Sequence, residues 1–169
     1  MSKTQTTNSV IMIEPVGFRS NPETKESNNF QNNENNSAAL SSLALNEMNS
    51  FKQQLQEKGV NVLSFKGQQD CPDDIFPNNW ISTHQDGKII IYPMLAKNRR
   101  LERRADIIEK LSHPLSELWN ISEKEEGGEI LEGTGSLVLD RVNNTAFCAL
   151  SDRSSKTLAE LWCKKMGYK

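Results

Sequence analysis

Two tight-turn signals, each between short β-type runs, constrain the fold of this chain more than any other feature. Asp86-Gly87 separates the run Trp80–Thr83 from the run Lys88–Tyr92, and an Asp-Gly pair in that setting is a strong hairpin signal. Asn143-Asn144 is turn chemistry of the same kind between two later runs. Helical segments lie between the hairpins, so the sequence predicts an α/β protein with mixed sheets rather than a doubly wound parallel sheet.

Helical spacing and further β-type runs complete this prediction. Apolar residues recur three or four apart from Ala38 to Lys58, and Gly59 is a typical helix stop before the next strand. Further helices are expected at 99–111 and 155–166, and further strands at 10–13, 60–63, 128–131, 136–140 and 145–150. The recurrence of hairpin and helix indicates structural repeats of roughly 60 residues, a size that suits propeller-like units with one helix each.

The chain has 169 residues, which is enough for one domain with a hydrophobic core, and we expect a single domain over 1–169. Residues 1–9 are polar and are expected to form a disordered tail. Residues 20–37 are dominated by Asn, Ser, Glu and Gln. They are expected to form a long loop, which is either disordered or functional.

Composition excludes several classes of function. A net charge of −2 gives no electrostatic reason to expect nucleic acid or an anionic membrane as a partner. The apolar runs are too short for a membrane helix, and the N-terminus lacks the apolar region of a secretory signal. The three cysteines include no CxxC pair, which argues against a disulfide framework or a zinc site and favours a reduced, cytoplasmic setting. No motif implies a metal or an organic cofactor.

A polar cluster precedes the strand that begins at Trp80, and it contains Asp74, Asn78 and Asn79. Asparagine has low strand propensity, and its amide both donates and accepts hydrogen bonds, which suits a neutral ligand such as an amide or a urea. The alternative is an Asx-turn that leads into the strand. These three residues are candidate substrate-binding residues.

Four arginines lie within six residues, at Arg99, Arg100, Arg103 and Arg104. An arginine fork binds a carboxylate bidentately, so Arg99 or Arg100 could hold the carboxylate of an amino acid. The alternative is a solvated helix face with internal pairs to nearby acidic residues.

Glu132 lies in a glycine-rich stretch, between Leu131 and Gly133. The stretch lacks the lysine and the spacing of a phosphate loop. A partly buried carboxylate at a strand end could orient a histidine or accept from a cationic substrate. The alternative is a hairpin corner with an incidental glutamate.

Taken together, these clusters resemble the guanidine-modifying superfamily of arginine deiminases, dimethylarginine hydrolases and amidinotransferases. The nearest likeness is to bacterial amidinotransferase-like citrulline hydrolases (citrulline ureidases). The likeness extends from Val10 to about Arg153. The strings that carry it include Asn29-Phe30-Gln31, Phe76-Pro77-Asn78-Asn79-Trp80, Tyr92-Pro93-Met94, Asn98-Arg99-Arg100-Leu101-Glu102 and Leu131-Glu132-Gly133-Thr134-Gly135-Ser136.

The resemblance implies part of a five-bladed α/β propeller, the pentein fold. It implies that the 20–37 loop, with Phe30, borders the active site. It implies that Arg99 or Arg100 holds the substrate carboxylate, and that Glu132 supports the catalytic histidine and the substrate nitrogens. In the implied mechanism a cysteine thiolate attacks the central carbon, a histidine transfers protons and water resolves the covalent intermediate.

The sequence departs from the family pattern in two ways. Arginine-processing relatives place an aspartate where Asn79 stands, and an asparagine favours a neutral ureido group, so we expect a citrulline-like substrate. The catalytic histidine and cysteine of the family find no match here, so we expect the N-terminal half of a hydrolase, incomplete for catalysis. Such a half is expected to self-associate or to pair with a missing C-terminal half. The alternatives are a non-catalytic binding or interaction module, and an amidinotransferase.

Overall fold

The computed structural model describes residues 4–25 and 38–169. The chain divides into two compact units. The N-terminal unit comprises Thr7–Pro77 and Ala96–Glu102, and the C-terminal unit comprises Met1–Thr6, Asn78–Leu95 and Arg103–Lys169.

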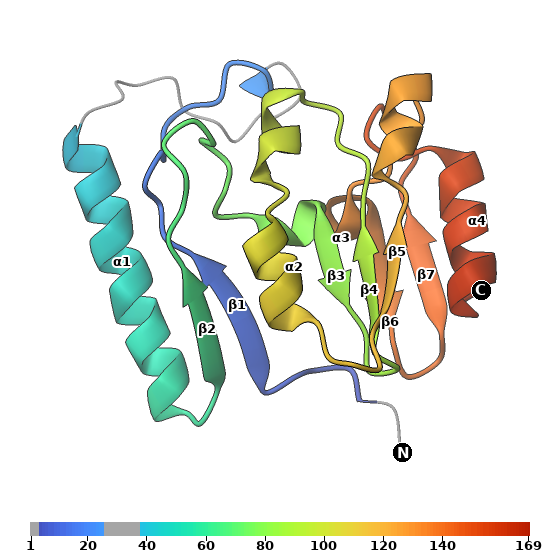
Figure 1. Ribbon diagram of the computed structural model, residues 1–169, viewed down its shortest axis with the longest axis horizontal. Coiled ribbons are helices and arrows are strands. Elements are labelled where there is room, and N and C mark those ends of the chain that lie inside the picture. The colour runs from blue at the N-terminus through green and yellow to red at the C-terminus, as the bar shows by residue number, and fades with distance from the viewer. Residues whose placement is uncertain (1–3, 26–37) are drawn as a thin grey trace. The chain divides into compact units, whose positions relative to one another are not determined.

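The N-terminal unit is built on one β-α-β crossover (Figure 1). Strands β1 (Ser9–Ile13) and β2 (Asn61–Phe65) pair in parallel, with Ile13 opposite Phe65. Parallel strands need a long connection, and helix α1 (Ala38–Glu57) is part of it and contacts β2. The short helix η3 (Asn98–Glu102) also belongs to this unit. The expected helix, the glycine stop at Gly59 (φ +80°) and the following strand are confirmed.

The C-terminal unit contains a three-stranded sheet in the order β3-β4-β5. Strands β3 (Ile81–Thr83) and β4 (Lys88–Ile91) form the antiparallel hairpin expected at Asp86-Gly87, and Gly87 has φ +83°. Strand β5 (Glu117–Asn120) pairs in parallel with β4. Helix α2 (Ala105–Leu111) lies in the connection between them, so a second β-α-β crossover is formed.

A second hairpin follows in the same unit. Helix α3 (Gly133–Ser136) leads into β6 (Leu137–Asp140), which pairs antiparallel with β7 (Thr145–Cys148), and Asn144 takes φ +51° in the turn. Helix α4 (Lys156–Met166) begins after the Ser155 cap and ends at Gly167 in the left-handed region. The chain then returns to β7, where Ala146 N donates to Lys169 O and Lys169 N donates to Asn144 O.

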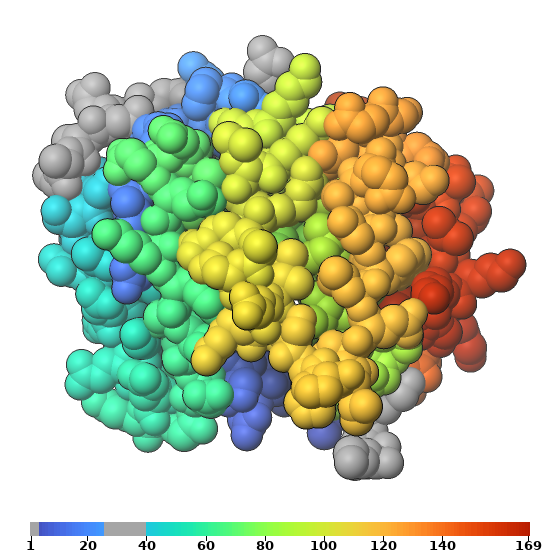
Figure 2. All heavy atoms as spheres, viewed as in Figure 1, coloured from blue at the N-terminus to red at the C-terminus, as the bar shows by residue number. Residues whose placement is uncertain are grey.

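The hydrophobic core of the C-terminal unit lies between α4 and the strands. Trp162 and Leu158 of α4 pack with Ile90, Leu137 and Leu139 of the strands. Helix α2 contributes the fully buried Ile107, while most of its remaining surface faces outward, as the yellow region of Figure 2 shows. The expected fold class, α/β with mixed sheets, hairpins and interleaved helices, is confirmed.

Two expected elements are wrong. Residues 128–131 do not form a strand. They follow the short helix η4 (Ser122–Gly127), and among them only Leu131 makes a single β-bridge, to Ser154. The expected helix over 99–111 is interrupted at Arg103 and Arg104, between η3 and α2, and the backbone of Arg104 is extended. The strand β5 was missed because four residues with the exposed Leu118 carry little local signal.

Several residues of the N-terminal segment that was expected to be a disordered tail make defined contacts. The Gln5 side-chain amide donates to Leu139 O and accepts from Arg141 N, both at 2.8 Å, and so it lies against the outer edge of β6. Ser9 begins β1. Within the described parts of the chain, no helix is both long enough and apolar enough to cross a membrane.

Candidate functional site

Glu132 is the centre of a buried polar group in the C-terminal unit. It is fully buried at the start of α3, and three donors converge on its carboxylate. Oε2 accepts from Asn79 Nδ2 and from Arg153 Nη1, each at 3.1 Å, and Oε1 accepts from Leu95 N at 3.0 Å. A cationic partner and two further donors offset the free-energy cost of burying this carboxylate. Because both of its oxygens already accept hydrogen bonds, Glu132 is suited to hold the surrounding residues in place.

The backbone of Glu132 is fixed by a second set of bonds. Glu132 N donates to Ser136 Oγ at 2.8 Å and to Arg153 O at 3.3 Å, and Ser136 Oγ donates to Arg153 O at 2.5 Å. Arg153 therefore contacts Glu132 through both its side chain and its backbone. The sequence interpretation missed Arg153, because it stands alone between Asp152 and Ser154 without a motif of its own.

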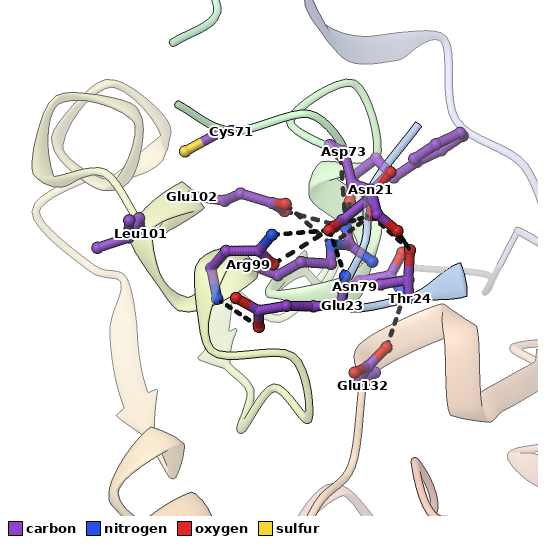
Figure 3. Close-up of polar contacts among 12 residues, drawn as sticks. Asn21, Glu23, Thr24, Cys71, Asp73, Asn79, Arg99, Leu101, Glu102 and Glu132 are labelled. Carbon is purple, nitrogen blue, oxygen red and sulfur yellow. Dashed lines mark hydrogen bonds and ion pairs between the residues drawn. The ribbon is translucent and has the colours of Figure 1, made fainter. Parts of the chain in front are cut away.

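The orientation of the Asn79 side-chain amide follows from its hydrogen bond to Glu132. Figure 3 labels both residues. A carboxylate only accepts, so the amide NH₂ of Asn79 must face Glu132 and the carbonyl Oδ1 must face away. Within the described residues, Oδ1 accepts no hydrogen bond, and Asn79 is half-buried. The arrangement thus presents a fixed, neutral acceptor for an N–H group.

Asn78 is placed differently from its neighbour. It is exposed, and its amide donates to Thr134 Oγ1 at 2.8 Å. The structure therefore brings Asn78, Asn79 and Glu132 together in the C-terminal unit, with Asn79 alone of the two asparagines bound to the carboxylate.

Glycine is required where the α3 turn meets these asparagines. A Cβ at Gly133 would overlap Asn78 O, and its φ of +36° is unfavourable for other residues. A Cβ at Gly135 would lie 2.5 Å from Asn79 Nδ2. The glycine-rich stretch thus allows the turn to contact the two asparagines directly.

Replacing Gly135 by Ala is expected to push the Asn79 amide away from Glu132 and to destabilise the C-terminal unit by about 2 kcal/mol. Urea denaturation measures this loss. Gly127→Ala is the matched control, because a Cβ at Gly127 meets nothing within 4 Å. Equal stability of the Gly135→Ala and Gly127→Ala variants would contradict the expected contact.

Arg99 is buried in the N-terminal unit and forms an internal ion pair. Its Nε and Nη2 donate to the two oxygens of Glu102 at 2.9 and 3.0 Å, and Nη2 also donates to Phe76 O at 3.3 Å. Arg99 is 4% exposed and Glu102 is fully buried. Burial raises the pKa of Glu102 to about 7, and the hydrogen bonds from Arg99 act in the opposite direction. Arg99 thus makes one internal pair of the kind that the alternative for the arginine cluster named, but the pair is buried and does not lie on a solvated helix face.

Of the remaining candidates in the N-terminal unit, Asp74 lies in a turn after β2 and Arg100 lies in η3. Asp74 is buried, and its Oδ2 accepts from Gln68 N at 2.8 Å, which fixes a turn. Arg100 is half-buried in η3. Phe30 lies outside the described residues.

A polar cluster that the sequence interpretation did not single out surrounds Asp73 (Figure 3). Asp73 Oδ2 accepts from Asn21 Nδ2 at 2.6 Å and from Thr24 Oγ1 at 3.4 Å. Asn98 Nδ2 donates to Asn21 Oδ1 at 2.7 Å, and Asn98 N donates to Glu23 Oε2 at 3.0 Å. The chain from Asn21 to Thr24 is thereby tied to η3, so the first part of the expected 20–37 loop is held by side-chain bonds.

Cys71 and Cys163 lack the lowered pKa that favours a nucleophilic thiolate. Cys71 is buried, and burial followed by the charge of Asp74 raises its pKa to about 11. Burial also raises the pKa of Cys163. Both ring nitrogens of His84 are engaged, Nε2 with Ser82 Oγ and Nδ1 with Arg141 Nη1. Among the described residues, no group of three or more His, Cys, Asp or Glu could hold a metal ion.

Comparison with known families finds one match that covers most of the chain. The family model described as "N,N dimethylarginine dimethylhydrolase, eukaryotic" matches residues 14–169. No curated protein sequence matches the chain.

Solved structures share the fold at low sequence identity. The N-terminal domain of ArgZ, an arginine dihydrolase from the ornithine-ammonia cycle in cyanobacteria, bound to its substrate, has a TM-score of 0.70 at 14% identity. This likeness covers 95% of the present chain and 55% of the ArgZ chain. A dimethylarginine dimethylaminohydrolase adduct with 4-chloro-2-hydroxymethylpyridine gives 0.63 at 17% identity, over 95% and 57% of the two chains.

A third structure, AgrE in a ternary complex with ornithine and NAD⁺, gives a TM-score of 0.65 at 18% identity. It covers 89% of the present chain and 21% of AgrE. The chain therefore spans little more than half of the ArgZ domain and about a fifth of AgrE. The fold is that of the guanidine-modifying enzymes, which confirms the expected superfamily.

Proposed function

Since this chain belongs to the N,N dimethylarginine dimethylhydrolase family, we propose that it forms part of a cysteine-dependent hydrolase for the ureido or guanidino carbon of an amino acid. In this proposal the 169 residues bind and orient the substrate, and the nucleophilic cysteine and the histidine come from further sequence. The observation that carries the proposal is the Glu132–Asn79 pair, which presents a fixed acceptor to a substrate N–H.

A neutral, citrulline-like substrate suits this pair better than arginine. The carboxylate of Glu132 already has a cationic partner in Arg153, and Asn79 adds no second negative charge. Asn79 Oδ1 can accept from the N–H groups of a ureido side chain without leaving a buried charge unpaired. ArgZ and the dimethylaminohydrolase carry names that refer to arginine and dimethylarginine, which supports an amino acid with a guanidino-type or ureido-type side chain as the substrate class.

A substitution at Asn79 tests this preference. Calorimetry of the chain is expected to show tighter binding of citrulline than of arginine. In Asn79→Asp a second carboxylate would lie about 3 Å from the Glu132 oxygen. Two carboxylates at that distance favour a bound cation, so the order is expected to reverse, by about tenfold in the ratio of affinities.

Asn78→Asp is the matched control. It introduces the same charge at an exposed neighbour whose amide contacts Thr134 instead of Glu132, and it is expected to keep the citrulline preference. Tighter binding of arginine by the unaltered chain would refute the proposed substrate. Absence of binding to both amino acids would refute the proposal that this chain forms the binding part.

Hydrolysis and amidinotransfer differ in whether water or an amine resolves the covalent intermediate. We propose hydrolysis, because the matching family and two of the similar structures carry the names of hydrolases. We further propose that the chain associates with the part that supplies the cysteine and the histidine. Free Cys71, Cys148 and Cys163 support a reduced, cytoplasmic setting.

A further inference from the structure

We propose that Arg103 and Glu125 form a positioning pair for Glu132 and Asn79, acting through the backbone of residues 93–95. The effect on ligand affinity rests on the proposed function, whereas the effect on the geometry of Asn79 does not. Arg103 belongs to the arginine cluster seen in the sequence, and its side chain is largely buried.

The pair itself is bidentate and largely buried. Arg103 Nη1 donates to Glu125 Oε2 at 2.8 Å, and Arg103 Nη2 donates to Glu125 Oε1 at 2.6 Å. The Glu125 side chain is 6% exposed and the Arg103 side chain is 18% exposed. Two parallel charge-assisted bonds fix both position and orientation. The pair links η4 to the segment before α2.

The same two side chains bind the peptide groups on either side of Pro93. Arg103 Nη1 donates to Tyr92 O at 3.2 Å, and Glu125 Oε2 accepts from Met94 N at 2.9 Å. Proline has no N–H of its own, so the polar groups of this segment are the flanking ones. The Arg103–Glu125 pair therefore holds the chain on both sides of Pro93.

The next peptide carries this constraint to the candidate site. Leu95 N, one residue beyond Met94, donates to Glu132 Oε1 at 3.0 Å. Asn79 and Arg153 both donate to the other oxygen, Oε2. Leu95 N consequently fixes the rotation of the carboxylate and, with it, the direction in which Oε2 meets the Asn79 amide. Consecutive amides at 94 and 95 thus bind two different glutamates, and the first glutamate determines where the second amide points.

A role in stability alone would predict something different. If Arg103 and Glu125 served only to hold η4 against the unit, their loss would lower the melting temperature and leave the folded site unchanged. If they position Leu95 N, their loss also loosens the Glu132–Asn79 contact in protein that is still folded. The side-chain amide of Asn79 reports this contact directly, because its NH₂ protons are protected by the carboxylate.

The experiment measures hydrogen exchange of the Asn79 side-chain amide by NMR in the ¹⁵N-labelled chain, with calorimetric titration of citrulline alongside. In Glu125→Gln the Asn79 NH₂ is expected to exchange about tenfold faster, and citrulline affinity to fall about tenfold, while backbone resonances of the core stay in place. Arg103→Lys keeps the charge but loses the fork, and it is expected to act in the same direction. Arg103→Lys replaces Glu125→Gln as the test variant if Glu125→Gln does not fold.

Asp106→Asn is the matched control, since it removes the neighbouring Arg104–Asp106 pair, in which Asp106 is exposed. It is expected to leave Asn79 exchange unchanged. Unchanged exchange of Asn79 in folded Glu125→Gln and Arg103→Lys would overturn the inference, and so would an equal effect of Asp106→Asn. If the unaltered chain binds neither citrulline nor arginine, the proposed function fails, but Asn79 exchange still decides the positioning role.

Discussion

Replacing Glu132 by Gln is expected to lower the free energy of unfolding of the C-terminal unit by about 3 kcal/mol, because one change removes the charge on which three donors converge. The glutamine side chain has the same shape, but its amide nitrogen would face one of the donors instead of accepting from it. Arg153 Nη1 would lose its carboxylate, and either Leu95 N or Asn79 Nδ2 would face another N–H group. Urea denaturation at neutral pH measures the loss.

The same substitution is expected to weaken citrulline binding about 100-fold, since the orientation of Asn79 Oδ1 depends on the Glu132 carboxylate. Glu123→Gln, at an exposed glutamate of η4, is the matched control and should leave both stability and binding unchanged. A Glu132→Gln variant as stable as the Glu123→Gln variant would show that the carboxylate does not hold these donors together.

Sequence reasoning located the elements whose signals are local. The Asp86-Gly87 hairpin depends on a two-residue turn, and α4 depends on the Ser155 cap and Gly167. Each signal lies within the element that it defines. These parts of the fold are therefore readable without knowledge of the rest of the chain.

The parts that failed are decided by contacts distant in sequence. The helix expected at 99–111 is interrupted at Arg103, whose guanidinium binds Glu125, 22 positions away. The acidic partner of Arg99 is only three positions away at Glu102, but its complete burial depends on packing that local spacing does not reveal. Helical spacing gave no sign of either outcome, because both depend on tertiary burial.

The candidate site shows the same division. Asn79 and Glu132 were predicted as site residues, and the structure joins them by a hydrogen bond across 53 positions. Arg153 completes the group without any motif. Their shared role in binding stays a prediction until a ligand titration is made, whereas their mutual contact follows from the fold.

His84 is joined by a chain of hydrogen bonds to strand β3, to helix α4 and to the residues that directly follow β4 and β6. Its Nε2 lies 2.9 Å from Ser82 Oγ, which lies 2.8 Å from Tyr92 OH, and Trp162 Nε1 donates to Tyr92 OH at 3.0 Å. Arg141 Nη1 lies 3.4 Å from His84 Nδ1. An arginine only donates, so Nδ1 accepts and Nε2 carries the proton of a neutral ring. Burial raises the pKa of Tyr92 to about 12, which keeps its hydroxyl protonated.

Burial lowers the pKa of His84 from 6.5 to about 4 in the folded chain. The charges of Arg141 and Lys88 act in the same direction, and Asp86 opposes them. As the pH falls, the unfolded chain therefore binds a proton at His84 at a higher pH than the folded chain does. The neutral ring contributes about 3 kcal/mol to the free energy of unfolding. This contribution is fully present above pH 6.5 and is lost as the pH falls toward 4.

The comparison of unaltered chain and His84→Gln isolates this contribution, because all carboxylates titrate in both proteins. Between pH 7 and pH 4, the unaltered chain is expected to lose about 3 kcal/mol more unfolding free energy than the variant. Urea denaturation at a series of pH values measures the difference, and His113→Gln removes an exposed imidazole as the matched control. Parallel curves for the unaltered chain and His84→Gln would mean that the ring gains a proton in the folded unit as readily as in the unfolded chain. In that case the bond from Arg141 would not hold the ring neutral, and Arg141 Nη1 would have to move away from Nδ1, the ring nitrogen that would carry the second proton.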